Sequence, residues 1–141
     1  MARVDFYVLS QSGEQARLAF ACRLAEKVYR LDNSVYIHAA SQADAARLDD
    51  MLWTYRDGSF VPHGVVGSSA GDESPVRIGF GDTAAPKSDL LINLCDDVPP
   101  MAESFARVAE LVTSDDDDRQ KSRRRFAAYR EHGHDIETHN I

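Results

Sequence analysis

Short apolar segments alternate with longer segments of helical periodicity, and this alternation constrains the fold of the chain more than any other feature. Residues 4–9 form a β-rich apolar run, which residues 10–13 (SQSG) interrupt. The apolar residues that follow recur at steps of four, four and three, at Phe20, Leu24, Val28 and Leu31. This spacing places them on one face of a helix, so strand, turn and helix are expected in that order.

A second strand and a second helix follow. Residues 34–39 (SVYIHA) have the composition of a strand. Ser41 is suited to cap the amino end of a helix that carries Ala45, Leu48 and Leu52 on its apolar side. The first half of the chain is therefore predicted to be β-α-β-α.

The second half is less regular. Residues 57–75 are rich in Gly, Ser, Asp and Pro and predict a long connection. Residues 76–80 and 89–94 predict two strands, the second apolar enough to be covered on both faces. We expect a helix over residues 99–112 and a carboxyl-terminal helix over residues 115–131. The four aspartates that open this last helix suit the positive end of its dipole.

Alternating strands and helices define an α/β layer fold, in which right-handed crossovers link the strands of a mainly parallel sheet flanked by helices. The chain has 141 residues, of which 43% are hydrophobic, so residues 1–141 are expected to form a single domain. Its opening residues do not resemble a signal peptide, and no run approaches the roughly 18 apolar residues of a membrane span. We therefore expect a cytoplasmic protein.

The turn after the first strand is where a fold of this kind would bind a nucleotide. Such a turn needs glycines, because backbone N–H groups must approach the phosphate closely. Residues 9–14 (LSQSGE) carry one glycine, no lysine and an acid, and a net charge of −7 also opposes phosphate binding. The nucleophile elbow of serine hydrolases, a G-x-S-x-G turn between a strand and a helix, is also not expected, because the one match to this pattern, residues 67–71 (GSSAG), lies in the polar connection. We expect no catalytic residue and no cofactor; the alternative is a small nucleotide-dependent or hydrolytic α/β enzyme with its site near residues 10–13.

Metal-binding patterns are weak in this sequence. Cys22 and Cys95 are isolated, and we expect both to be reduced thiols. Three histidines and two acids gather near the carboxyl end, a composition that can hold a transition metal. They are His132, His134, Asp135, Glu137 and His139. We expect a solvated tail there and no metal site.

One aromatic segment stands out from its polar surroundings. Trp53 lies near the end of the second predicted helix, and Phe60 and Pro62 follow it in the polar connection. Aromatic side chains often close over a core. In a connection, however, large apolar groups often form an exposed patch for a partner. The local sequence leaves both interpretations open.

A basic run occupies the carboxyl-terminal helix. Four of its residues share one helical stripe, because they are spaced by three or four positions: Arg119, Arg123, Phe126 and Arg130. Arginine forks pair with carboxylates, and a ring beside them can receive an apolar side chain, so this stripe suits an acidic peptide. The alternative is a solvated helix face whose charges balance Asp115–Asp118.

Five segments, in order over nearly the whole chain, resemble the chi subunit of the bacterial DNA polymerase III holoenzyme. They are residues 4–9, 47–53, 59–63, 89–94 and 125–130. The resemblance implies a Rossmann-like α/β domain without enzymatic activity that works at the replisome. It also implies a 1:1 heterodimer with the psi subunit, which links chi to the clamp loader, and only indirect contact with DNA.

The resemblance gives each of the two features a partner. The psi subunit, or a helicase as an alternative partner, would bind Trp53, Phe60, Val61, Pro62 and His63. The acidic, phenylalanine-ended tail of single-stranded DNA-binding protein would bind the second site, with Arg123 as the carboxylate clamp. The residues of this tail site would be Val112, Arg119, Arg123, Phe126 and Arg130.

The chain departs from the family pattern at the second site. Phe126 stands where the family has a tyrosine, and Ala127 stands where a lysine is expected. Arg124 and Arg125 add positive charge beside them, and Asp115–Asp118 would compete with an acidic tail for the same arginines.

Overall fold

A computed structural model of the protein describes residues 2–54, 61–67, 74–81 and 87–141. The strands are β1 (Arg3–Val8), β2 (Val35–Ala39), β3 (His63–Val65), β4 (Val76–Phe80), β5 (Leu90–Asn93), β6 (Arg107–Val112) and β7 (Asp135–Asn140). The helices are α1 (Glu14–Arg30), α2 (Gln42–Thr54), the 3-10 helix η1 (Pro100–Ser104) and α4 (Asp116–Glu131). Within these described ranges, no helix is both long and apolar enough to cross a membrane.

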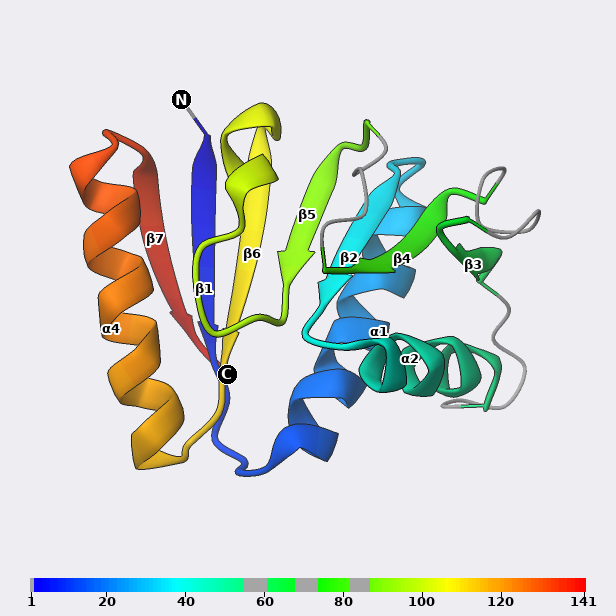
Figure 1. Ribbon diagram of the computed structural model, residues 1–141, viewed down its shortest axis with the longest axis horizontal. Coiled ribbons are helices and arrows are strands. Elements are labelled where there is room, and N and C mark those ends of the chain that lie inside the picture. Colours follow the sequence, from blue (N-terminus) through cyan, green and yellow to red (C-terminus); the bar gives the residue numbers. More distant parts are fainter. Residues whose placement is uncertain (1, 55–60, 68–73, 82–86) are drawn as a thin grey trace.

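The strands form one sheet in the order β3-β4-β2-β5-β6-β1-β7, and every pairing in it is parallel (Figure 1). One core lies between the sheet and the helices α1 and α2, around residues such as Leu18 and Leu48. The other core lies on the opposite face, where Phe105 after η1 and Tyr129 of α4 cover the strands. The predicted α/β class and its Rossmann-like parallel sheet are confirmed.

Two predicted helix starts have the expected chemistry. The Asp44 N–H donates to Ser41 Oγ at 3.1 Å, which confirms Ser41 as the cap of α2. Asp115 is the residue that precedes α4, and three aspartates fill the first turn of that helix. Hydrogen bonds from the Gly13 N–H and the Thr113 hydroxyl hold the pKa of Asp115 below its ordinary range.

The helix predicted over residues 99–112 is wrong. The segment forms η1, where Pro100 occupies the first helical position, and then strand β6. Phe105, Val108 and Val112 have helical spacing, but all three belong to the core on the α4 side of the sheet. Strand β6 is buried on both faces, so its near-continuous apolar run carries no period-2 signal that would distinguish it from a helix.

The two edge strands of the sheet, β3 and β7, were not predicted. Strand β3 lies inside the expected connection 57–75 and pairs with β4. The expected tail is also wrong, because β7 pairs with β1 and forms one edge of the sheet, although most side chains of this segment are exposed to solvent as expected. Both edge strands are short or polar, so they lack the apolar pattern that identifies strands in a sequence.

Replacing Gly79 with alanine is expected to destabilise the protein by about 1–3 kcal/mol. A Cβ at Gly79 would lie 2.8 Å from Cε1 and 2.9 Å from Cζ of Tyr36, closer than carbon atoms pack. The Tyr36 side chain cannot move away easily, because it is buried, its ring stacks on Phe105, and its hydroxyl forms a hydrogen bond with His38 Nδ1 at 3.2 Å. Urea denaturation of Gly79→Ala measures this cost. The cost should shrink in a Tyr36→Leu background, and an equal cost in both backgrounds would contradict the proposed clash.

Alkaline pH is expected to weaken the fold through its buried thiol. Cys22 is completely buried, and burial raises its pKa from 9.0 to about 12. Because the raised pKa belongs to the folded state, the neutral thiol stabilises fully below pH 9, and this contribution is lost as pH rises toward 12. The loss is about 1.4 kcal/mol per pH unit. The free energy of unfolding measured between pH 8 and 10.5 should fall more steeply for the wild type than for Cys22→Ala, and parallel curves would contradict the prediction.

Candidate partner-binding sites

The first site is centred on Trp53, near the carboxyl end of α2. Its side chain is 55% exposed, so Trp53 does not close over the core. The indole packs edge-on against the His63 ring of β3, with the ring centroids 4.7 Å apart. Trp53 therefore presents a large aromatic surface to solvent where α2 packs against β3, and we call this the Trp53 surface.

His63 supports this surface from below. Its side chain is fully buried. Nδ1 lies 2.6 Å from the Val61 carbonyl oxygen, and Nε2 lies 3.0 Å from the Asp49 carbonyl oxygen and 3.3 Å from the Asp49 carboxylate. These contacts fix the ring against which Trp53 packs. His63 thus positions Trp53 instead of meeting a partner directly.

The other residues predicted for the first site differ in accessibility. Val61 is buried in the core beside α2, and Pro62 is half-buried. Phe60 lies outside the residues that the structure describes. Trp53 is therefore the predicted residue with the largest described apolar surface for a partner.

The second site is a groove between α4 and the sheet, which we call the α4 groove. It encloses about 220 Å³ beneath Arg123 and Phe126 of α4. The groove is lined by Phe6, Val8, Val112, Ser122, Arg123, Phe126 and Thr138. Phe126 packs on Phe6 with ring centroids 5.4 Å apart, so the floor is apolar and aromatic.

Three of the five predicted tail residues, Val112, Arg123 and Phe126, line the α4 groove. Arg119 and Arg130 are exposed, one turn away on the same stripe of α4. The sequence analysis missed the floor residues, among them Phe6 of β1 and Thr138 of β7. They meet because Phe6 pairs in register with Thr138, a long-range relation that local periodicity does not contain.

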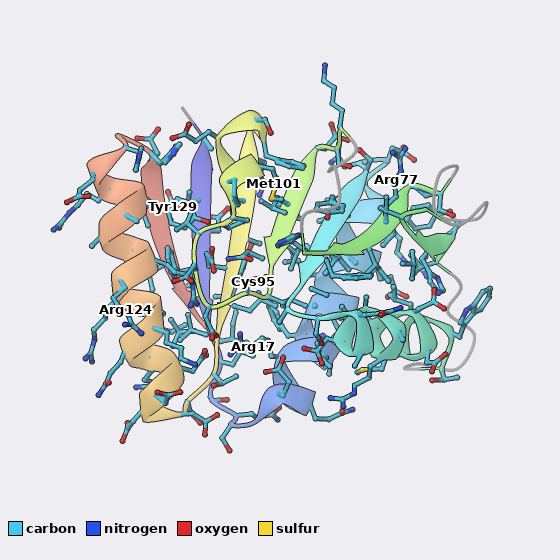
Figure 2. All side chains as sticks on the ribbon, viewed as in Figure 1. Arg17, Arg77, Cys95, Met101, Arg124 and Tyr129 are labelled. Carbon is cyan, nitrogen blue, oxygen red and sulfur yellow. The ribbon has the colours of Figure 1, made fainter. Side chains whose placement is uncertain are left out.

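Arg125 is not available to a partner, contrary to its expected role as additional surface charge. It is buried, and its Nε donates to Glu110 at 2.8 Å while Nη1 donates to the Asp96 carbonyl at 3.0 Å. By contrast, Arg124 is exposed and lies on the outer side of α4 (Figure 2). The basic run therefore divides into one structural arginine and several surface arginines.

Glu110 is the centre of this buried network, and the sequence analysis missed it. Its carboxylate is fully buried and accepts hydrogen bonds from Tyr129 at 2.6 Å and from Asn93 at 2.9 Å, in addition to the bond from Arg125. Burial raises the pKa of Glu110, and the nearby Arg125 charge opposes this rise. The sequence did contain a signal for this network, since Glu110 is an acidic residue in the middle of an otherwise largely apolar segment. The network anchors α4, and with it one wall of the α4 groove, to β5 and β6.

The acidic run at the start of α4 binds the protein's own groups. Asp118 forms an ion pair with Arg17 at 2.5 Å and accepts the Thr113 N–H at 2.7 Å. Asp117 lies 3.3 Å from Lys121. Asp115, Asp117 and Asp118 thus have partners other than the arginines of the stripe, which leaves that stripe suited to an external anion.

A larger cleft of about 410 Å³ lies at the carboxyl ends of the strands, where α/β folds commonly bind nucleotides. Six carboxylates and two basic groups line it: Glu14, Asp44, Asp96, Asp115, Asp117, Asp118, Arg17 and Lys121. This excess of negative charge repels phosphate groups. The cleft therefore counts against the nucleotide-dependent alternative.

Fold and sites together define a class of protein: a Rossmann-like α/β domain with an exposed aromatic surface at one edge of its sheet and a basic, apolar-floored groove at the other. Comparisons with known proteins identify its family. Residues 1–137 match the family model described as "DNA polymerase III chi subunit, HolC", and the chain belongs to this family of DNA replication accessory proteins.

Named relatives match over nearly their full length. The chain is 43% identical over 141 residues to DNA polymerase III subunit chi of Pseudomonas aeruginosa, covering 100% of this chain and 98% of that protein. It is 30% identical over 143 residues to the protein of the same name from Escherichia coli K12, covering 98% and 97% respectively. The resemblance to chi seen in the sequence is confirmed.

One solved structure illustrates how widely the fold is shared. The crystal structure of T4 UvsW matches 99% of this chain with a TM-score of 0.67 at 9% sequence identity. The chain spans only 41% of that protein, so the likeness concerns the fold alone.

Proposed function

We propose that the protein is a non-catalytic adaptor that connects the psi subunit of the clamp-loader complex to the carboxyl-terminal tail of single-stranded DNA-binding protein. The observation that carries the proposal is the separation of the two sites. Trp53 packs on β3 at one edge of the sheet, whereas β7 at the other edge contributes to the α4 groove (Figure 1). Two partners can therefore bind at the same time without colliding.

The α4 groove has the chemistry that an acidic tail ending in phenylalanine needs. Its floor of Phe6, Val8 and Val112 is apolar and can receive an aromatic side chain. Arg123 at the rim can pair with a carboxylate, while Arg119 and Arg130 extend positive charge along the helix. Contacts of this kind are screened by salt and exchange rapidly.

The Trp53 surface offers a different kind of contact. An exposed indole held on a buried histidine is a preorganised apolar anchor, and anchors that become fully desolvated dissociate slowly. This suits a stable 1:1 complex with psi, with a helicase as an alternative occupant. The chain itself carries a net charge of −7, so its contact with DNA would be indirect, at a cytoplasmic replisome.

Replacing Arg123 with alanine is expected to weaken tail binding about tenfold or more, because hydrogen bonds to charged groups are worth about 1.5–3 kcal/mol. Calorimetry with a peptide that ends in Asp-Asp-Asp-Ile-Pro-Phe measures the affinity at low salt. Arg124→Ala is the matched control, since it removes the same charge from the outer side of α4. An equal loss of peptide affinity in the two variants would show that binding depends on the general positive charge of α4 and not on a specific Arg123 contact. Absence of peptide binding by the wild type would rule out the tail site.

The bridge itself is tested by assembling all three components. Size-exclusion chromatography of the chain with psi and a fluorescent tail peptide should give one peak that contains the three. Trp53→Ala should release psi and keep the peptide, whereas Arg123→Ala should release the peptide and keep psi. Displacement of one partner by the other would contradict the bridging function.

A further inference from the structure

Three metal-ligand side chains converge where β1 and β7 pair, outside both partner sites. Asp5 on β1 pairs in register with Glu137 on β7, and His139 follows two residues later on the same face of the sheet. Within the described ranges, these three form the one group of His, Cys, Asp and Glu side chains whose ligand atoms all lie within 4.8 Å of one another. The set differs from the histidine tract seen in the sequence, because Asp5 joins it from the other end of the chain.

The geometry of the group is close to that of a metal's first coordination shell. His139 Nε2 lies 2.9 Å from Asp5 Oδ1 and 3.9 Å from Glu137 Oε2. Ligand atoms about 2.0–2.2 Å from a tetrahedral ion are separated by roughly 3.3 Å, and both His139 distances differ from this value by about half an ångström. Asp5 is almost completely buried, and the His139 ring stacks on Tyr7 at 5.0 Å, so two of the three ligands are held in place.

Arg3 currently supplies the positive charge at this position. Its guanidinium lies 2.9 Å from Glu137 Oε2 and 3.4 Å from Asp5 Oδ1, the same oxygen atoms that face His139. The Arg3 side chain is half exposed, so it can move into solvent without burying an unpaired charge. Arg107 lies 3.6 Å from the other Asp5 oxygen and can remain there. Arg3 is therefore a competitor for a cation.

We propose that Asp5, Glu137 and His139 form a binding site for a divalent transition-metal ion of the zinc class, which displaces Arg3. One imidazole and two carboxylates suit zinc or nickel better than magnesium, which prefers oxygen ligands and water. His139 would coordinate through Nε2 and carry its remaining proton on Nδ1. The bound ion would connect the edge strand β7 to β1 and stabilise this edge of the sheet.

Two substitutions with opposite expected effects test the site. Calorimetric titration of the full chain, prepared without a histidine tag, with zinc chloride should show one ion bound per chain. His139→Ala should weaken binding by about tenfold or more, as loss of a coordinating or supporting group does. Arg3→Gln should instead tighten binding several-fold, because it removes the competing charge and keeps the polar side chain.

The control is His132→Ala, since His132 is an exposed histidine at the end of α4 whose Nδ1 contacts the Ala128 carbonyl. It should leave zinc affinity unchanged, and zinc should raise the melting temperature of the wild type but not of His139→Ala. Loss of binding in His132→Ala with normal binding in His139→Ala would overturn the site. So would the absence of zinc binding by both the wild type and Arg3→Gln.

Discussion

Replacing Glu110 with alanine is expected to lower the free energy of unfolding by about 3–5 kcal/mol, because the Arg125 guanidinium would remain buried without its counter-ion. The ion pair has a 2.8 Å contact, and both side chains are almost completely inaccessible to solvent. The change also removes the acceptor for Tyr129 and Asn93. Each unsatisfied buried donor adds a desolvation penalty of about 1–3 kcal/mol, although these terms overlap.

Denaturation with guanidinium chloride, monitored by tryptophan fluorescence and by circular dichroism, measures the loss in the free energy of unfolding. Arg124→Ala is the control on the same helix, where an exposed arginine should change stability by no more than about 0.5 kcal/mol. The double replacement Glu110→Leu with Arg125→Met should recover the part of the loss that comes from the unpaired charge, because it removes both charges together, whereas the Tyr129 hydroxyl still lacks its acceptor. A Glu110→Ala variant as stable as Arg124→Ala would show that the buried network does not hold α4.

Replacing Trp53 with alanine is expected to weaken psi binding by about 2–4 kcal/mol, a loss of roughly 30-fold to 1,000-fold. The indole combines a large apolar area with a fixed orientation, since it packs on a histidine that is itself held by Val61 and Asp49. Aromatic side chains that are exposed in the free protein and buried in the complex are typical binding hot spots. Surface-immobilised psi with soluble variants gives the dissociation constants, and the loss should lie mainly in the dissociation rate.

Leu31 provides the matched control for Trp53. It is another exposed large apolar residue, 64% accessible and located just after α1. Leu31→Ala should bind psi like the wild type. The stability of Trp53→Ala should also stay within about 1 kcal/mol of the wild type, because a half-exposed side chain loses little packing. Normal psi binding by Trp53→Ala would exclude the Trp53 surface as the docking site.

Several features of this protein were determined by local sequence. The apolar spacing of Phe20, Leu24 and Val28 in α1, the Ser41 cap of α2 and the aspartates that open α4 each involve residues within a few positions of one another. Leu31, which was predicted on the same apolar face, instead follows α1 and is exposed. The same is true of the stripe that carries Arg123 and Phe126. Helix periodicity and capping act over one or two turns, so the sequence itself contains the whole signal.

Tertiary structure alone decided the rest. Whether residues 107–112 form a strand depended on strand partners on both sides, and the polar segment 135–140 became β7 only because β1 accepted it at the edge. Burial of Arg125 required Glu110 opposite it. These outcomes depend on contacts between residues that are separated by 15 to more than 130 positions in the sequence. A local sequence pattern carries no information about the free energy of such contacts. The sequence therefore predicted the α/β class and the stripe on α4, whereas the floor of the α4 groove and the cluster around Asp5 emerged only when distant strands paired.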